Sequence, residues 1–335
     1  MQSDVIHEES NPMNILGKLS ALFRPETSNE VDEETVLIDQ VVNATDSAIA
    51  SVAGYREVLL PAVRHALDHY TQVVQAIPGP ITVSHQSYRA DPLVKALFPS
   101  HEEIAVALGR SVEVRDAIKT HAASNRGSVC ALLGMRMRTG DGRRPSRDCV
   151  EHTDFAVTAN LLADHTFRDL AADEDDVRQA LRDAAFKSLV KTFAAEIKSR
   201  HREMRLLKTD RNVSQEFIRV GAGNPDHDHH HHTVKALDQH LERHAEDLSP
   251  EGTLLALVDW LWSPETHLRL EADGGHGVSH IQQGPGSSNS ELHLHLPLLA
   301  TTDRRQWLVC ITRVPIEEAM QAVAQETRAH RHILV

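Results

Sequence analysis

The chain has few aromatic residues, few cysteines and no long hydrophobic run. Phe, Trp and Tyr make up 4% of its 335 residues, so Leu, Val, Ile and Ala must build the core, a composition that favours helices. The three cysteines, Cys130, Cys149 and Cys310, are widely separated and form neither a disulfide framework nor a thiolate metal motif. They are typical of a protein whose thiols stay reduced.

Membrane-spanning and secretory signals are also missing. The longest strongly apolar stretch runs from Leu254 to Trp262 and is too short to cross a bilayer. The N-terminal segment carries Asp4, Glu8 and Glu9, which is the wrong charge for a secretory signal. We therefore expect a soluble, cytoplasmic protein with no membrane insertion.

No common catalytic motif is present: the sequence lacks a P-loop, a Rossmann glycine fingerprint, a nucleophile elbow and an EF-hand loop. The net charge of −13 argues against nucleic acid as a partner, because that binding depends on cation–phosphate contacts. Residues 126–215 alone carry a positive balance, with 17 bases and 14 acids. We interpret their arginines as a surface for an acidic protein segment.

A helical pattern dominates the N-terminal part of the chain. Apolar and small residues recur at alternating spacings of three and four, at Ile38, Val41, Thr45, Ala48, Val52, Tyr55 and Leu59. This coiled-coil-like seam predicts either two consecutive amphipathic helices interrupted at Pro61 or one long helix kinked there. It favours self-association or a protein partner, so we expect a homo-oligomer. An intramolecular helical hairpin is the alternative.

Strand patterns appear later. Residues 129–138 and 148–158 predict a β-hairpin, which is followed by a long amphipathic helix from about residue 177. Helices are expected over residues 233–248 and from Pro250. Alternation at residues 267–271 and 291–296, and an apolar run at 306–314, predict an antiparallel sheet before a final helix that starts after Pro315.

These patterns predict an α+β fold with a mainly helical N-terminal half of long amphipathic helices. Its C-terminal half would hold an antiparallel sheet flanked by helices. The expected parts are a flexible tail over residues 1–28, a helical domain over 29–125 and a β-hairpin with a long helix over 126–220. They continue with a His-rich loop over 221–232 and an α+β domain over 233–335.

Histidine is abundant, with 23 residues, and five of them gather at His227, His229, His230, His231 and His232. Neutral imidazole binds zinc, nickel and copper, so this His-rich loop is a candidate metal-binding segment. The alternative is a loop that binds metal in vitro without a physiological role.

A second candidate metal site lies on a predicted strand. His293 and His295 would share one face of it, and His276, His280 or Asp273 could supply further ligands. Nitrogen and oxygen ligands favour zinc as the cofactor. The alternative is a solvated polar stripe, because Leu292, Leu294 and Leu296 already provide a buried face.

The sequence therefore supports two hypotheses. The first is a non-enzymatic scaffold, adaptor or regulatory subunit that acts through its long helices. The second is a zinc-dependent enzyme or metal sensor with a histidine site on the C-terminal sheet. The sequence leaves open whether the chain has enzymatic activity, and no catalytic residue is assigned.

Overall fold

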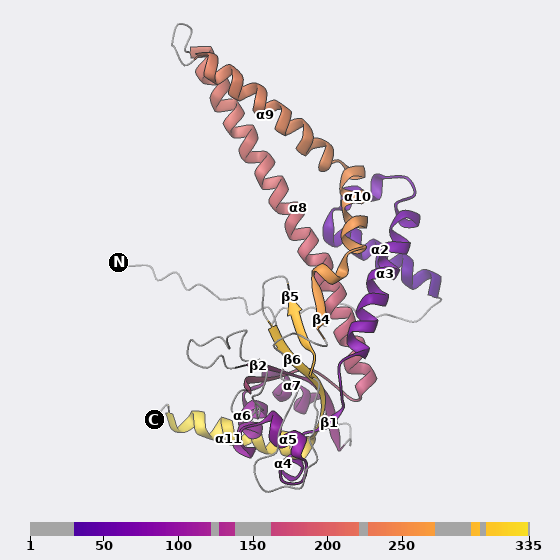
Figure 1. Cartoon of the computed structure of the whole chain (residues 1–335), viewed down its shortest axis with the longest axis vertical. Helices are drawn as coiled ribbons and strands as arrows, with labels where there is room; N and C mark the ends of the chain where they lie inside the picture. The colour runs from indigo at the N-terminus through magenta and orange to yellow at the C-terminus, as the bar shows by residue number, and fades with distance from the viewer. Residues whose placement is uncertain are drawn as a thin grey trace, which may run out of the picture. The chain divides into compact units, whose positions relative to one another are not determined.

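The computed structural model describes residues 30–121, 127–137, 162–220, 227–271, 296–301 and 306–333 (Figure 1). Over these residues the chain forms ten α-helices and a six-stranded sheet, so the α+β class is confirmed. Contacts divide the chain into two compact units. Unit 1 comprises Met1–Leu22, Thr71–Ala184 and Glu265–Val335, and unit 2 comprises Phe23–Tyr70 and Ala185–Pro264.

The sheet of unit 1 is mostly antiparallel. Its strands are β1 (Ile81–Thr82), β2 (Ser128–Met137), β3 (Leu162–Ala171), β4 (Leu268–Glu271), β5 (Leu298–Thr301) and β6 (Gln306–Pro315). They lie in the order β3-β2-β6-β5-β4, and β1 pairs with β6 in parallel. We expected the sheet to lie in the C-terminal half of the chain. This was only partly right, because β2 and β3 come from mid-chain. The predicted strand at 148–158 and residues 291–295 of the strand predicted at 291–296 lie outside the described residues, and Leu296 is not in a strand.

Both faces of the sheet are covered. On β2, Leu133 and Met135 belong to one apolar cluster, and Cys130 and Leu132 belong to a second cluster on the other face. A strand that is buried on both faces reads as a continuous apolar run, which is the pattern of residues 129–135. The buried thiol of Cys310 on β6 has its pKa raised to about 12 by burial, so it stays protonated and unreactive.

Helices cover the first cluster. They are α4 (His85–Ala90), α5 (Pro92–Leu97), α6 (His101–Arg110), α7 (Val112–His121) and α11 (Ile316–Ile333). Ser84, Asp91 and Ser100 accept backbone hydrogen bonds as N-caps of α4, α5 and α6. Pro92 occupies the first position of α5, where its missing N–H costs nothing.

Unit 2 contains α2 (Glu30–Thr45), the 3-10 helix η2 (Ser47–Ser51), α10 (Pro250–Leu261) and most of α3 (Tyr55–Gln75). The break between the first two long helices falls at Asp46–Gly54, and Pro61 lies inside α3. Our prediction of an interruption at Pro61 was therefore wrong. Asp46 caps η2, and Gly54 has a φ of 72°, so these two residues turn the chain before the proline is reached.

This turn folds the predicted seam onto the chain itself. Ile38 and Val41 on α2 are 2% exposed, and Leu59 on α3 is fully buried. Arg56 and Arg64 on α3 make bidentate hydrogen bonds to Asp39 and Glu34 on α2, respectively. The hydrogen bonds from Arg56 and Arg64 lower the pKa of Asp39 and Glu34. Ile38, Val41 and Leu59 are thus buried within one chain, as the hairpin alternative requires, whereas Ala48 is exposed, and self-association stays a prediction.

Two long helices complete the described fold. Helix α8 (Glu174–Val220) has 47 residues, and α9 (His227–Asp247) has 21. The indole N–H of Trp260 on α10 donates to the carbonyl oxygen of Leu189 on α8 at 3.2 Å. No helix within the described ranges is long and apolar enough to cross a membrane.

Candidate functional site

The four predicted zinc ligands His276, His280, His293 and His295 lie outside the described residues, as does Asp273. The zinc hypothesis therefore stays a prediction. In the described ranges, no group of three or more His, Cys, Asp or Glu side chains is placed to hold a metal ion.

The histidines of the His-rich segment lie on a helix. We expected a loop over residues 221–232, but α9 begins at His227, and residues 221–226 lie outside the described part. The side chains of His229, His231 and His232 are exposed, and that of His230 is half-buried. Their helical environment was missed because four consecutive histidines mask the apolar periodicity that marks a helix, which starts only at Val234.

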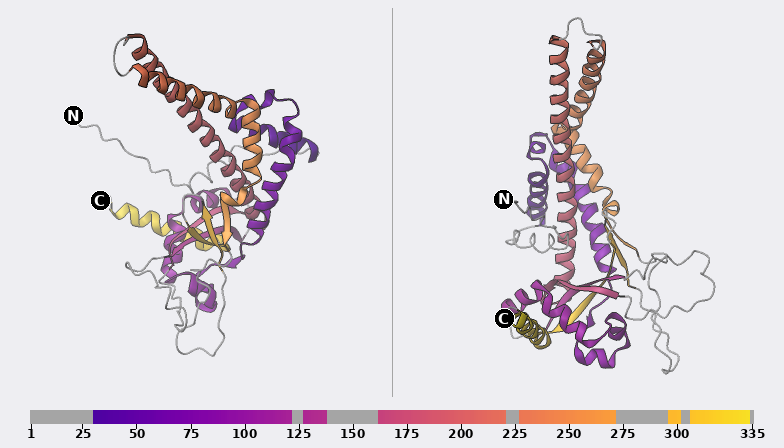
Figure 2. Two further views of the ribbon diagram at one scale, coloured as in Figure 1. Left: turned by 45° about the horizontal axis from the view of Figure 1, so that its top comes forward. Right: turned by 90° about the vertical axis from the view of Figure 1, so that its left-hand side faces the viewer.

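Helices α8 and α9 come together at their joined ends (Figures 1 and 2). We call residues 198–220 of α8 together with α9 the α8–α9 hairpin. The rings of Phe217 and His230 stack with centroids 5.0 Å apart and planes 11° from parallel. Further along, Arg211 Nε donates to a carboxylate oxygen of Asp238 at 2.5 Å. These two contacts fix the antiparallel register of the hairpin.

The inner face of the hairpin is only partly buried. On α8, Met204, Leu207 and Ile218 are half-buried and share a helix face with Arg211. On α9, Val234, Leu237 and Leu241 are half-buried as well. None of these six side chains is fully removed from water, so the distal hairpin has no deep core and each helix retains surface for other contacts.

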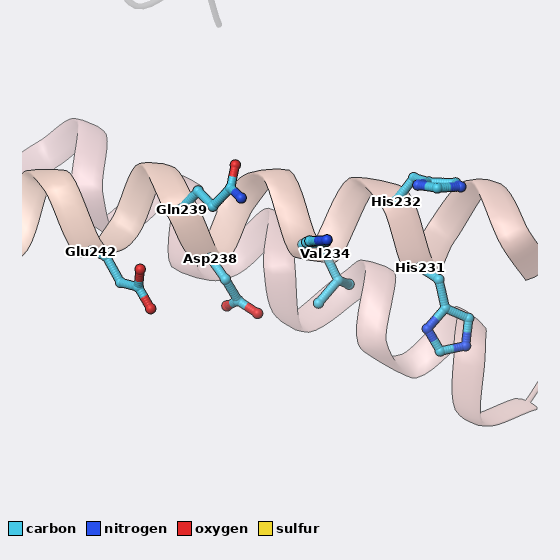
Figure 3. Close-up of a pocket in the computed structure, with 7 residues that line it drawn as sticks. His231, His232, Val234, Asp238, Gln239 and Glu242 are labelled. Atoms are coloured by element: carbon cyan, nitrogen blue, oxygen red, sulfur yellow. The ribbon is translucent and has the colours of Figure 1, made fainter.

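An open groove runs along α9 (Figure 3). His231, Asp238 and Glu242 lie on the same side of the helix in that view, at spacings of seven and four residues. All seven lining residues come from α9: His231, His232, Val234, Lys235, Asp238, Gln239 and Glu242. A groove formed by one helix is a poor enclosure for a small molecule, which needs walls from several elements.

Apolar side chains follow the outward side of α8 in the hairpin. We call this set the outer stripe, and its members Leu206, Val213, Phe217 and Val220 are 61%, 50%, 56% and 78% exposed. Their spacings of seven, four and three residues place them on one helix face. Helical periodicity turns this face away from Met204, and Phe217 at its edge also stacks on His230 of α9. The sequence contains this spacing, but the apolar face that we predicted for the long helix ended at Met204.

Basic residues continue this surface toward the base of the hairpin. Lys191, Lys198, Arg202 and Arg205 are exposed and have the same spacings of seven, four and three. Residues 198–220 carry seven bases and three acids in all. Arg211 and Arg219 are engaged by Asp238 and Glu216. The bases nearest the outer stripe, Arg202 and Arg205, thus give its proximal end a positive potential.

Unit 1 contains a separate polar cluster that the sequence did not predict. Arg168 Nη1 on β3 donates to Glu113 Oε1 on α7 at 2.6 Å, and the backbone N–H of Asp169 donates to Glu113 Oε2 at 2.8 Å. Burial, together with the neighbouring Glu113 carboxylate, raises the pKa of Asp169 to about 6. The residues are 55 and 56 positions apart in the chain, so no local pattern could have joined them.

Two further polar side chains lie on or beside β3. His165 Nε2 is 2.7 Å from the carbonyl oxygen of Leu97, and its ring stacks on Phe98. Arg136 on β2 lies over the ring of Trp307, at 4.7 Å from its centroid. Arg138, Arg143, Arg144 and Arg147, which follow Arg136 in the sequence, lie outside the described residues. Both contacts stabilise packing, and neither brings a nucleophile to the site.

Comparison of the chain with protein-family models, with curated proteins and with solved structures found no match.

Proposed function

We propose that the protein is a non-enzymatic scaffold or adaptor whose α8–α9 hairpin binds an amphipathic helix of an acidic protein partner. The outer stripe carries this proposal. Four large apolar side chains that are at least half exposed lie in line on one helix face. Leaving such a row in water is unfavourable, and aligned apolar residues on a long helix are a common docking surface for another helix.

Charge supports an acidic partner. Lys198, Arg202 and Arg205 adjoin the proximal end of the outer stripe. A partner helix with acidic residues beside its apolar face would gain favourable electrostatics and a faster association rate. A second copy of α8 would bring these bases against bases when packed in parallel, so we expect a different protein as partner.

Site-specific photo-crosslinking tests this function. A p-benzoylphenylalanine residue at position Val213 should form an adduct with an acidic protein in the cells that express the chain. Val112 provides a matched control, because it is 61% exposed on α7 in unit 1. The adduct should disappear when Leu206 and Phe217 are replaced by Glu, and sedimentation velocity should show that those variants remain folded.

Several results would refute the proposal. One is the absence of any adduct at Val213 and Leu206, and another is the same set of adducts from Val112. An adduct between two copies of this chain, with a doubled mass in sedimentation, would establish self-association through the outer stripe instead.

A further inference from the structure

Histidines fill the first two turns of α9. The helix begins at His227, and five of its first six residues are histidines. The backbone N–H groups of a first turn lack helical acceptors and give this end of a helix a partial positive charge. Imidazole is neutral at pH 7.5 and becomes cationic as the pH falls below about 6.5. Acidification therefore places positive charges at the helix end that tolerates them least.

The surrounding charges do not offset this effect. On the last turns of α8, Arg219 pairs with Glu216, and Arg211 pairs with Asp238 of α9, so these four groups largely cancel. Lys235 on α9 adds one positive charge to the groove beside His231 and His232, and Glu242 lies further along it. In the sequence, Asp226 and Asp228 are the nearest acids, two against five histidines.

Ring contacts join the histidines at this end of α9 to one another and to α8. His230 stacks on Phe217, and its ring also meets that of His229 edge-on at 5.9 Å between centroids. Protonating both rings would place two like charges side by side. The ion pair between Arg211 and Asp238 lies two turns further along α9. The first two turns can therefore detach without breaking that ion pair.

We propose that the histidines of α9 make the α8–α9 hairpin a pH-sensitive device. At neutral pH the first two turns of α9 stay helical against α8. Between pH 7 and 5.5 the accumulated positive charge unwinds them. Detachment uncovers Phe217 and the half-buried Ile218 beside Val220. The apolar surface at the end of α8 is thereby enlarged. The biological consequence of this enlargement rests on the proposed function of the hairpin.

Hydrogen–deuterium exchange of the full chain tests the device without any partner. After correction for intrinsic exchange rates, amides of residues 229–236 should lose at least tenfold protection between pH 7.5 and 5.5. A variant with His229, His230, His231 and His232 all replaced by Gln should keep its protection at both pH values. The double variant His229→Gln/His231→Gln should lose an intermediate amount.

The chain offers a matched control on the same helix. His240 and His244 lie near the C-terminal end of α9, where the helix dipole favours a positive charge. The variant His240→Gln/His244→Gln should therefore lose protection at residues 229–236 just as the wild type does. Both Gln variants remove imidazoles from α9, so position is the variable that separates them.

Equal protection of residues 229–236 in the wild type at both pH values would overturn the proposal. So would an undiminished loss in the four-Gln variant, or a loss that disappears in the control variant. None of these results bears on crosslinking from Val213 at pH 7.5. That experiment tests the binding function alone, so the two proposals can fail independently.

Discussion

Arg178 on α8 donates a hydrogen bond from Nη2 to the carbonyl oxygen of Ile77 at 3.0 Å, just beyond the end of α3. Its Nη1 donates to the carbonyl oxygen of Val74, and its Nε to Glu174 at 2.9 Å. Arg178 is 9% exposed, and its guanidinium satisfies carbonyl groups that the end of a helix leaves without partners. One side chain therefore ties the end of α3 to the start of α8 within unit 1.

Replacing Arg178 by Met should destabilise unit 1. The substitution keeps much of the apolar stem but leaves two buried carbonyl oxygens and Glu174 without their donor, which should cost about 3 kcal/mol. Urea denaturation monitored at pH 7.5 measures the change. Arg200→Met is the control, since Arg200 pairs with Glu196 on the exposed surface of α8 and should contribute less than about 0.5 kcal/mol. Similar losses in both variants would contradict the capping role.

Replacement by Asp should destabilise unit 2 strongly at Val41 and hardly at all at Ala48. Val41 is 2% exposed inside unit 2, whereas Ala48 on η2 is exposed. Val41→Asp buries an unpaired carboxylate and should cost about 4 kcal/mol or unfold unit 2. Ala48→Asp should change the free energy of unfolding by less than about 0.5 kcal/mol. Circular dichroism during thermal melting distinguishes them. A folded Val41→Asp variant would show that the buried seam is not required.

Asp169 should make stability depend on pH. Its pKa rises from 3.8 to about 6 in the folded chain, so the folded state holds this proton more tightly than the unfolded state. Stability is therefore lost as the pH rises from about 4 to about 6. Asp169→Asn should be more stable than the wild type by about 1–2 kcal/mol at pH 7.5, and equal to it near pH 4.

Asp164 provides the control for that measurement. Both aspartates lie on β3 with left-handed backbones, with φ of 54° at Asp164 and 50° at Asp169. Asparagine accepts this conformation, so strain does not distinguish the variants. Asp164 is exposed, and Asp164→Asn should change the free energy of unfolding by less than about 0.5 kcal/mol at pH 7.5. Parallel stability–pH curves for Asp169→Asn and wild type would refute the interpretation.

The zinc prediction is testable once the histidines of α9 are removed as a competing site. In a chain with His227 and His229–His232 replaced by Gln, about one zinc per chain should copurify if the sheet site exists. Adding His293→Ala and His295→Ala should abolish it. Elemental analysis gives the metal content. Loss of all zinc in the Gln variant alone would leave the solvated-stripe interpretation of His293 and His295.

Local signals were the predictable part of this fold. Asp91-Pro92 and Ser100 start helices where their capping chemistry requires, and the strand at 306–314 shows its apolar run directly. The break after α2 was misplaced because Pro61 is a strong general signal. Gly54 is weaker by itself, but a φ of 72° needs a glycine. Helix propensity alone does not reveal whether the chain turns at the glycine or at the proline.

Long-range relationships were beyond the sequence. The placement of β2 beside β6 depends on strand pairing across about 180 residues, as between Ala131 and Thr312. The Glu113–Arg168 pair and the capping of α3 by Arg178 depend on the same assembly. The outer stripe is different, because it lies within one helix. Its spacing was visible, but only the structure showed that no described element covers Leu206 and Val220.

Strand β3 lies at the edge of the sheet and is interrupted twice. Each left-handed aspartate sits where β3 holds one residue more than β2 opposite it, so Asp164 and Asp169 mark two β-bulges. The bulges twist the strand, and the exposed Asp164 adds a charge to it. An incoming strand from another molecule would meet misaligned hydrogen-bonding groups and would have to bury charge. The open sheet is thus protected against edge-to-edge aggregation by the same two residues that distort it.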